Sequence, residues 1–233
     1  MNRLVITMGD PCGVGPEIIV KFFDGIYKVE DKRFFLVVVG SKSVLEYYKK
    51  KLRIDLEIVE ITKAHIVDGK LENGKLHLIN IDTDIDKLEF GKHTELGGAL
   101  SIKYLDKAIE LCHGKYVDGI VTCPISKDSI NMAGFKYSGH TEYLAEKSKT
   151  EDFAMVLKGK KVVVLLNSTH VSLKEAINRV TKESVLNKIR LAQKAKKELG
   201  LTGSIAVAGL NPHNGENGLF GTEEIEIIAP AVE

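Results

Sequence analysis

Short apolar runs alternate with segments of helical periodicity along most of this 233-residue chain, and this alternation limits the folds that it can adopt. The apolar runs predict strands at Leu4–Thr7, Phe34–Val39, Leu56–Ile61, Gly119–Thr122, Val162–Leu166 and Ser204–Ala208. Helical periodicity predicts helices at Pro16–Phe23, Ser43–Leu52, Ala99–Cys112, Leu173–Val180 and Glu183–Leu199. Because several apolar runs are continuous, they indicate strands buried on both faces, as in a parallel sheet covered by helices. We therefore expect an α/β fold.

One segment departs from this order. In VDGKLENGKLHLINI (residues 67–81), Asn73 and Gly74 stand between apolar stretches, and this dipeptide favours the tight turn of a β-hairpin. We therefore expect an antiparallel ribbon inserted into the α/β pattern.

Composition and charge exclude several classes of protein. A hydrophobic content of 44% with 28% charged residues is typical of a globular protein, and the length suits one large or two small domains. The net charge of +1 gives no basic surface for nucleic acid or anionic membrane, and no apolar run reaches the roughly 20 residues that span a bilayer. Cys12, Cys112 and Cys123 lie far apart with no CxxC motif, and the N-terminus lacks a signal-peptide pattern. We expect a cytoplasmic protein without disulfides.

The stretch TMGDPCGVGPEII (residues 7–19) joins the first predicted strand to a helix. Its three glycines are Gly9, Gly13 and Gly15. Their spacing matches neither the GxGxxG of dinucleotide folds nor the GxxxxGK[ST] of a P-loop. Pro16 suits a first helical turn, and the carboxylate of Glu17 occupies the positive end of the helix dipole, where a phosphate would bind. We interpret the stretch as a tight strand-to-helix connection that needs positive φ at its glycines, rather than a pyrophosphate cradle.

Three of the seven histidines lie in polar, glycine-bearing or Ser/Thr-bearing stretches. They are His140 in YSGHTEYLAE, His170 in VVVLLNSTHVSL and His213 in IAVAGLNPHNGENG. His170 and His213 follow predicted buried strands, and ligands of open α/β sheets bind beyond the carboxyl ends of strands. Neutral imidazole is a common ligand of zinc, cobalt or nickel, although each ring could equally serve only to hydrogen-bond its own loop. The remaining histidines, expected at the surface or in the hairpin, are His65, His77, His93 and His113.

The stretch VTCPISKDSINMAG (residues 121–134) is predicted to leave a strand at Thr122, turn at Pro124 and enter a helix that carries Ser126 and Lys127. Lys127 could assist proton transfer or bind a phosphate or carboxylate. The alternative is a solvent-exposed lysine in a first helical turn.

The last residues, TEEIEIIAPAVE (222–233), begin like a helix, with Thr222 as N-cap and acids in the first turn. They stop without a C-cap, a strand or a tail. We therefore expect the given sequence to be a truncated form of a longer chain.

Taken together, these stretches resemble one enzyme family. TMGDPCGVGPEI, VTCPISKDSINMAG, SGHTEYLAE, NSTH and GLNPHNGENGLFGTEEIEIIAP follow the order found in 4-hydroxythreonine-4-phosphate dehydrogenase, the PdxA family of vitamin B6 synthesis. The resemblance implies an isocitrate/isopropylmalate dehydrogenase-like fold, with two α/β/α domains, a cleft between them and an active site at a homodimer interface. It places a first domain at 1–125, completed by a missing C-terminal segment, and a second at 126–233 that carries the substrate and metal residues.

The resemblance also implies roles for individual residues. His140 and Thr141 of the GHTE stretch would contact the phosphorylated substrate, while His170 and His213 would bind a divalent metal such as Zn, Mg or Co. The family's third metal histidine, in a later YHDQG stretch, and further substrate-binding Lys, Asn and Arg positions have no counterpart in this sequence. Because catalytic metals usually have three protein ligands and an open position, we expect this chain by itself to hold metal weakly or to be inactive.

The implied activity is oxidation of the 3-hydroxyl of 4-phosphooxy-L-threonine, a small phosphorylated hydroxy amino acid, by NAD or NADP. The product, 2-amino-3-oxo-4-phosphooxybutanoate, loses carbon dioxide to give 3-amino-2-oxopropyl phosphate for pyridoxal phosphate biosynthesis. No residue is assigned to the cofactor. Lys127 and Asp10 are candidates for the general base, and the glycine loop would form one wall of the cleft, where Asp10 orders a polar group of the substrate or a neighbouring lysine.

Three alternatives stay open at this point. The first is a sister dehydrogenase that acts on 4-phosphorylated threonate or erythronate. The second is a metal-dependent hydrolase that uses the same histidines with a bound water. The third is a non-catalytic truncated fragment that binds metal or a partner.

Overall fold

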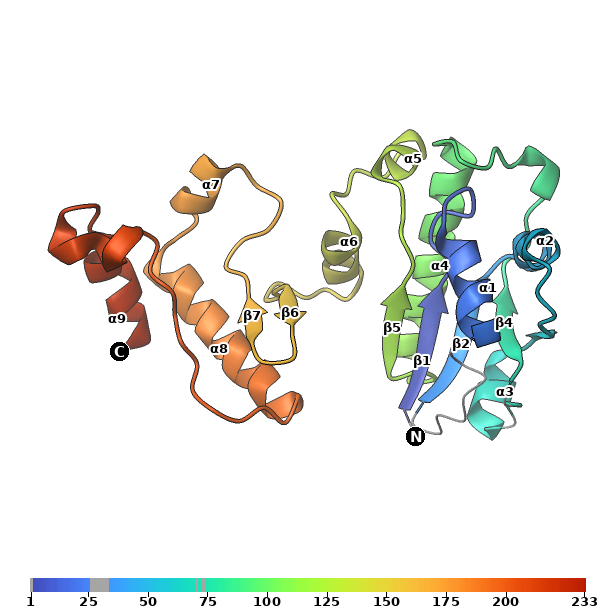
Figure 1. Ribbon diagram of the computed structural model, residues 1–233, viewed down its shortest axis with the longest axis horizontal. Helices are drawn as coiled ribbons and strands as arrows, with labels where there is room; N and C mark the ends of the chain where they lie inside the picture. The colour runs from blue at the N-terminus through green and yellow to red at the C-terminus, as the bar shows by residue number, and fades with distance from the viewer. Residues whose placement is uncertain (1, 26–33, 70, 73) are drawn as a thin grey trace. The chain divides into compact units, whose positions relative to one another are not determined.

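The structure is a computed structural model that describes residues 2–25, 34–69, 71–72 and 74–233 (Figure 1). The chain forms two compact units, Met1–Ser148 (unit 1) and Lys149–Glu233 (unit 2). The domain boundary expected after residue 125 lies ahead of helix α5 (Lys127–Met132), which packs in unit 1 against helix α4 (Glu95–His113). That boundary stays a prediction.

Unit 1 is built on a five-stranded parallel sheet, which confirms the predicted α/β class. The strands are β1 (Asn2–Thr7), β2 (Phe34–Gly40), β3 (Ile58–Glu60), β4 (Leu76–Asn80) and β5 (Gly119–Thr122). They lie in the order β3-β4-β2-β1-β5, so that β1 pairs with β2 on one side and with β5 on the other (Figure 1). Val37, Val38 and Val39 of β2 are fully buried, as a continuous apolar run in a sheet covered on both faces requires.

The crossovers of unit 1 contain α1 (Gly15–Gly25), α2 (Lys42–Leu52), α3 (Lys63–Asp68), the 3₁₀ turn η1 (Ile85–Lys87) and α4, while α5 and α6 (His140–Lys147) follow the last strand of the sheet. Helices α1, α2 and α4 follow the predicted alternation. The longest of these described helices, α4, begins at Thr94, whose side chain accepts a hydrogen bond from Gly97 N at 3.0 Å and so satisfies one free helix N–H. Leu100, Tyr104 and Ala108 lie on the face of α4 that joins the core of the sheet.

The prediction of an antiparallel ribbon at residues 67–81 is wrong. Residues 76–80 form β4, which pairs in parallel with both β2 and β3. Asn73, the first residue of the expected turn, lies outside the described residues, while Gly74 has a φ of 81°. The run LHLINI suits a hairpin arm and a central parallel strand equally well, and pairing with strands distant in sequence decides between them.

His77 lies inside β4 and is 3% exposed, which corrects the expected surface or hairpin position. Its Nε2 accepts a hydrogen bond from Glu72 N at 3.1 Å. Burial lowers the pKa of His77 below its ordinary value, because a buried imidazolium loses its hydration. The neutral ring therefore anchors the segment that leads into the strand.

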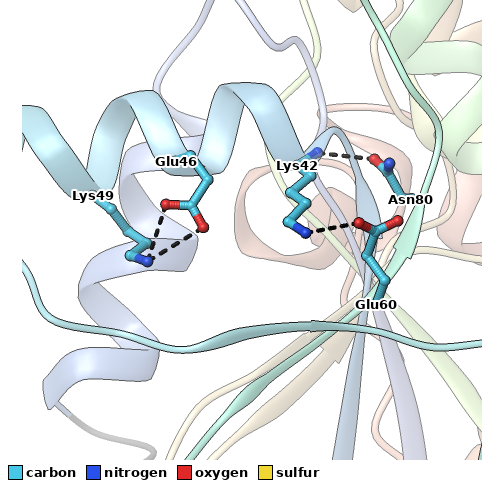
Figure 2. Close-up of polar contacts among 5 residues, drawn as sticks. All are labelled: Lys42, Glu46, Lys49, Glu60 and Asn80. Atoms are coloured by element: carbon cyan, nitrogen blue, oxygen red, sulfur yellow. Dashed lines mark hydrogen bonds and ion pairs between the residues drawn. The ribbon is translucent and has the colours of Figure 1, made fainter.

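Polar contacts connect α2 to the carboxyl ends of β3 and β4 (Figure 2). Lys42 N donates to Asn80 Oδ1 at 2.9 Å, and its Nζ lies 2.8 Å from Glu60 Oε1. Glu46 and Lys49 form a second ion pair one turn further along the helix, at 3.0 Å. The exposed ion pairs contribute little, whereas the bond from Lys42 N satisfies a helix N–H that has no partner within the helix.

Unit 2 has a small core. It contains the antiparallel pair β6 (Val156–Lys158) and β7 (Val163–Leu165), followed by α7 (Leu173–Asn178), α8 (Lys182–Glu198), the turn η2 (Pro212–Gly218), the π-helix η3 (Glu224–Ile228) and α9 (Ala229–Val232). Its fully described residues include three buried apolar side chains, Val185, Ile228 and Ala231. A cavity of about 880 Å³ is lined by β6, β7, α8 and residues 201–210.

The strand expected at Ser204–Ala208 is not formed, because these residues line the cavity without pairing to β6 or β7. The helix expected after Thr222 is present as η3 and α9, with a π turn that the sequence pattern did not predict. In the described part of the chain, no helix has both the length and the apolar character that a membrane span requires.

His77 predicts a pH dependence of the unfolding free energy. The ring has a pKa of about 6.5 when the chain unfolds and a lower one in the fold, so the unfolded state binds more protons and stability falls as the pH drops through this range. The stabilisation is fully present above pH about 6.5. Urea unfolding of the wild type, His77→Gln and the exposed control His113→Gln, between pH 8 and pH 5, tests this. The dependence of the unfolding free energy on pH should become weaker in His77→Gln and stay unchanged in His113→Gln. An unchanged dependence in His77→Gln would show that groups other than His77 cause it.

Candidate functional site

The strand order of unit 1 reverses between β1 and β5. The chain passes from β1 to β2 on one side, and later returns from β4 through α4 to β5 on the other. In open α/β sheets, ligands bind beyond the carboxyl ends of strands at such a switch point. The segments that leave these two strand ends are residues 8–14 and 123–126. They define the candidate site of unit 1.

The glycine loop at this point is the tight connection that the sequence predicts. Gly9 has a φ of 72°, and a Cβ at this position would lie 2.2 Å from Pro124 O. Gly15 keeps a negative φ and is required by close approach instead, since its Cβ would lie 2.0 Å from Met8 O. Positive φ, expected at all three glycines, occurs at Gly9 and not at Gly13. The loop is therefore pressed against the segment that follows β5.

The carboxylate of Asp10 joins this loop to two helices. Asp10 is 4% exposed; its Oδ1 accepts from Cys12 N and its Oδ2 from Ser129 Oγ, both at 2.9 Å. Ser129 Oγ also accepts from Thr94 N at 3.3 Å, which brings in the N-terminus of α4. A Cβ on Gly97 would lie 2.7 Å from Asp10 Oδ1, so α4 approaches the carboxylate closely. Both oxygens of Asp10 thus have internal partners, and its assignment as a general base stays a prediction.

Lys127 is exposed in the first turn of α5, which Ser126 caps by accepting from Ser129 N at 3.1 Å. The same Ser126 Oγ lies 2.7 Å from Nδ1 of His93, whose Nε2 is 3.8 Å from Asp128 Oδ2. This contact was not predictable from the sequence, because 33 residues separate His93 from Ser126 and only the packing of α4 against α5 brings them together. His93 is exposed, as predicted, but it has polar neighbours.

The thiols in these segments are poor nucleophiles. Burial raises the pKa of Cys123 to about 11 and also raises that of Cys12. Both therefore stay protonated at neutral pH, and the reactive thiolate form is scarce. The described cysteines form no disulfide.

His140 and Thr141 open helix α6, as the GHTE stretch suggested. Nε2 of His140 is buried without a hydrogen-bond partner among the described residues, and so is Oε2 of Glu142. Burial lowers the pKa of His140, and a hydrogen bond to the Cys123 backbone opposes this shift. Because buried polar atoms in native proteins are nearly always paired, a free ring nitrogen beside a helix N-terminus is a position that a polar ligand can fill.

His170 and His213 both lie on exposed loops of unit 2. His170 follows β7 and precedes Ser172, the N-cap of α7. Val163 and Val164 of β7 are exposed, so His170 follows a strand but not the buried one that was expected, and His213 follows residues 204–208, which are not a strand. The ring of His213 lies 6.0 Å from that of Phe220.

His213 begins an unusual left-handed turn. Residues 213–217 all have positive φ, between 43° and 78°. Glycine and asparagine tolerate this conformation, but at His213 and Glu216 it costs about 1–2 kcal/mol each. Strained backbone of this kind clusters at functional sites, where the surrounding contacts hold it in place. The local geometry therefore marks the His213 loop as a candidate functional segment.

Unit 2 contains side chains of the type that binds a divalent metal. Two exposed imidazoles, those of His170 and His213, are suitable donors for zinc or cobalt. In the described ranges, no group of three His, Cys, Asp or Glu side chains converges, so a complete ligand set is not present there. The pairing of His170 with His213 on one ion stays a prediction.

Asp10→Asn should lower the unfolding free energy by about 1–3 kcal/mol, because a neutral amide replaces the charge-assisted hydrogen bonds that the buried carboxylate accepts from Cys12 N and Ser129 Oγ. Urea unfolding followed by circular dichroism measures this. Asp68→Asn, at an exposed position, is the control and should change the value by less than about 0.5 kcal/mol. Equal unfolding midpoints for Asp10→Asn and the wild type would contradict the structural role of this carboxylate.

Comparison with known proteins gives one consistent family. Residues 32–233 match the family model described as pyridoxal phosphate biosynthetic protein PdxA. A putative D-threonate 4-phosphate dehydrogenase of Fusobacterium nucleatum is 42% identical over 233 residues, which are 100% of this chain and 69% of that protein. A 4-hydroxythreonine-4-phosphate dehydrogenase of a Sulfurihydrogenibium species is 41% identical over 235 residues, covering 100% of this chain and 70% of that protein.

A solved structure supports the same assignment. The crystal structure of 4-hydroxythreonine-4-phosphate dehydrogenase from Klebsiella pneumoniae matches with a TM-score of 0.88 at 34% identity, over 99% of this chain and 69% of that one. The family expected from the sequence stretches is thereby confirmed, as is the isocitrate dehydrogenase-like α/β fold. The chain therefore belongs to the PdxA family of dehydrogenases.

Proposed function

We propose that the protein oxidises the 3-hydroxyl of 4-phosphooxy-L-threonine with NAD or NADP. The product, 2-amino-3-oxo-4-phosphooxybutanoate, is a β-keto acid that loses carbon dioxide to give 3-amino-2-oxopropyl phosphate, a step in pyridoxal phosphate biosynthesis. Membership of the PdxA family and relatives named for this reaction support the proposal. The structural observation that carries it is the buried Nε2 of His140 at the start of α6, which has no hydrogen-bond partner in the described part of the chain.

The end of α6 suits a phosphorylated ligand. Gly139, the N-cap, offers no side-chain oxygen to the first helix N–H groups, so among the described residues an anion would compete for these donors only with the carboxylate of Glu142 in the same turn. Nε2 of His140 and the hydroxyl of Thr141 stand in the first turn beside them. Together they would orient the substrate by its phosphate, and such positioning can supply a large part of a rate enhancement.

The hydrogen bond of His140 to the Cys123 backbone determines what the ring can do. Nε2 has no partner among the described residues and the contact raises the pKa, as donation to a carbonyl would, so we assign this contact to Nδ1 as the donor. Nε2 of the neutral ring is therefore an acceptor. A phosphate dianion also only accepts, so the ring must take up a proton to bind it.

The remaining roles fall to both units. A divalent metal such as Zn, Mg or Co, held by His170, His213 and a further ligand, would polarise the substrate hydroxyl and later the ketone as a Lewis acid. Lys127 and Asp10 stay the candidates for the general base. Of the two, Lys127 is exposed, whereas both oxygens of Asp10 are engaged by Cys12 and Ser129.

The comparisons with known proteins also support a second candidate substrate. The 42% identical relative is named for D-threonate 4-phosphate and the 41% identical relative for 4-hydroxythreonine 4-phosphate, so sequence similarity does not separate them. The two substrates share the 4-phosphate and the 3-hydroxyl and differ at C2, which bears a hydroxyl or an amine. The contacts assigned to His140 and Thr141 would serve either one.

The proposal also covers the oligomeric state of the protein and its location in the cell. We expect a homodimer with the active site at its interface, as the family resemblance implies. We also expect a cytoplasmic location, which the three free thiols support.

The substrate assignment is tested by steady-state formation of NADH or NADPH with each of the two phosphorylated substrates. A higher kcat/KM with 4-phosphooxy-L-threonine is expected, and a preference for D-threonate 4-phosphate would establish the sister activity instead. Release of inorganic phosphate without reduction of the nicotinamide would contradict both and favour the hydrolase. No turnover of either kind would identify the 233-residue chain as a non-catalytic fragment.

In a protein that also contains the family's third metal histidine, His170→Ala and His213→Ala should each reduce metal-dependent NADH formation by at least about 100-fold, because removal of a direct metal ligand costs more than removal of a residue that only orients a ligand. Circular dichroism should show an unchanged fold, since both side chains are exposed. His113→Ala, also exposed, is the matched control and should keep full activity. Normal activity in either ligand variant would refute the metal assignment.

Substrate binding should take up close to one proton between pH about 7 and 8, where the free ring of His140 is neutral and the phosphate is a dianion. Uptake should vanish as the pH falls below the lowered pKa of the free ring. Calorimetry in two buffers of different ionisation enthalpy measures it. In His140→Gln the amide N–H can donate a hydrogen bond without first taking up a proton, so this variant should bind the substrate with no proton uptake. Equal proton uptake in the variant and the wild type would contradict this role of His140.

A further inference from the structure

Glu224 is a buried acid of unit 2, 4% exposed, whose carboxylate accepts hydrogen bonds from the segment that leads to His213. Its Oε1 accepts from Leu210 N at 2.7 Å and from Asn211 N at 2.6 Å. Its Oε2 accepts from Asn211 Nδ2 at 3.0 Å. Glu224 therefore fixes two consecutive backbone N–H groups and one side chain immediately before Pro212 and His213.

The loop has no room for other side chains around this carboxylate. A Cβ on Gly215 would lie 2.9 Å from Glu224 Oε2 and 2.8 Å from Gly221 O. A Cβ on Gly209 would lie 3.3 Å from Glu224 Oε1 and 2.8 Å from Asn214 Oδ1. The segment from 209 to 221 thus wraps closely around Glu224.

The same segment contains the left-handed turn that begins at His213. Three backbone bonds close it from inside: Asn214 N to Asn211 O at 3.2 Å, Leu219 N to Glu216 O at 3.2 Å and Phe220 N to Gly215 O at 3.1 Å. Glu224 lies outside the turn, as the first residue of the π-helix η3, and such helical irregularities are frequent at functional sites. A strained turn persists only where its surroundings hold it, and Glu224 is the group placed to do so.

We propose that Glu224 is the positioning residue for His213: its carboxylate holds residues 209–221 in the left-handed turn that presents the imidazole. This inference rests on the proposed role of His213 as a metal ligand. The chemistry requires an acid, because all three partners are donors and a carboxylate only accepts. A glutamine here would turn its own N–H₂ toward one of these donors.

The test compares Glu224→Gln with Glu226→Gln, which makes the same change of charge at an exposed position of the same π-helix. The first readout is amide hydrogen exchange of Leu210 and Asn211 in the metal-free protein. We expect exchange to be at least about tenfold faster in Glu224→Gln and unchanged in Glu226→Gln, because both N–H groups then have only a neutral amide oxygen as acceptor, while the N–H₂ that replaces Oε2 faces the donor Asn211 Nδ2.

The second readout is the affinity for Co²⁺ alone, followed by its visible absorption. We expect Glu224→Gln to weaken the Kd by about 10–100-fold, as for residues that orient a ligand, and Glu226→Gln to bind like the wild type. Glu224→Asp keeps the charge but is shorter by one methylene, and it should give intermediate values in both readouts. It also serves if Glu224→Gln does not fold.

The outcomes separate this inference from the proposed function. Unchanged exchange at Leu210 and Asn211, or faster exchange with unchanged Co²⁺ affinity, would overturn the positioning role. A His213→Ala control that loses Co²⁺ affinity while Glu224→Gln does not would contradict the inference alone. A His213→Ala control that binds Co²⁺ like the wild type would contradict the proposed metal role, and the inference with it.

Discussion

The hydrogen bonds of the buried Asp10 carboxylate hold the candidate site of unit 1 together. Through Cys12 N and Ser129 Oγ they connect the loop after β1 to α5, and through Ser129 they reach the N-terminus of α4 at Thr94. A negative charge beside two helix N-termini is electrostatically favourable, and its burial is tolerated because both oxygens have donors. The position of α5, and of the segment that leads on to His140, follows from this junction at the switch point of the sheet.

The two units supply different chemistry. Unit 1 offers a helix N-terminus with a His140 nitrogen that no described residue pairs, which suits an anionic group. Unit 2 offers exposed imidazoles at His170 and His213, the second of them on a left-handed turn held by Glu224. The proposed metal-assisted oxidation of a phosphorylated alcohol would use both kinds of group. Neither set of residues would indicate that reaction by itself.

Continuous apolar runs and long helical periodicity made most of unit 1 predictable from the sequence. The strand Gly119–Thr122 was predicted with its observed bounds, and α4 was predicted within a few residues of its ends. The parallel pairing of residues 76–80 could not be predicted, because a short apolar run does not specify its neighbours in the sheet. Residues 204–208 show the converse: an apolar run forms a strand only where a partner strand is available.

The candidate site was predictable only in its residue types. The histidines of GHTE, NSTH and NPH were recognisable from their polar surroundings, and the glycine-rich composition of 209–221 indicated a turn. The handedness of that turn was not predictable, because Asn and Gly permit several conformations. Glu224 was missed as well: it acts on Asn211 from 13 positions away, through a contact that exists only once η3 has formed.

The most direct test of the central claim is to follow the hydrogen at C3 of the substrate. With 4-phosphooxy-L-threonine carrying deuterium at C3 and unlabelled NAD or NADP, mass spectrometry of the reduced nicotinamide shows whether that atom is transferred. The account predicts one deuterium in each reduced cofactor formed, together with release of carbon dioxide. Reduced cofactor without deuterium, or consumption of the substrate with no reduced cofactor, would contradict it.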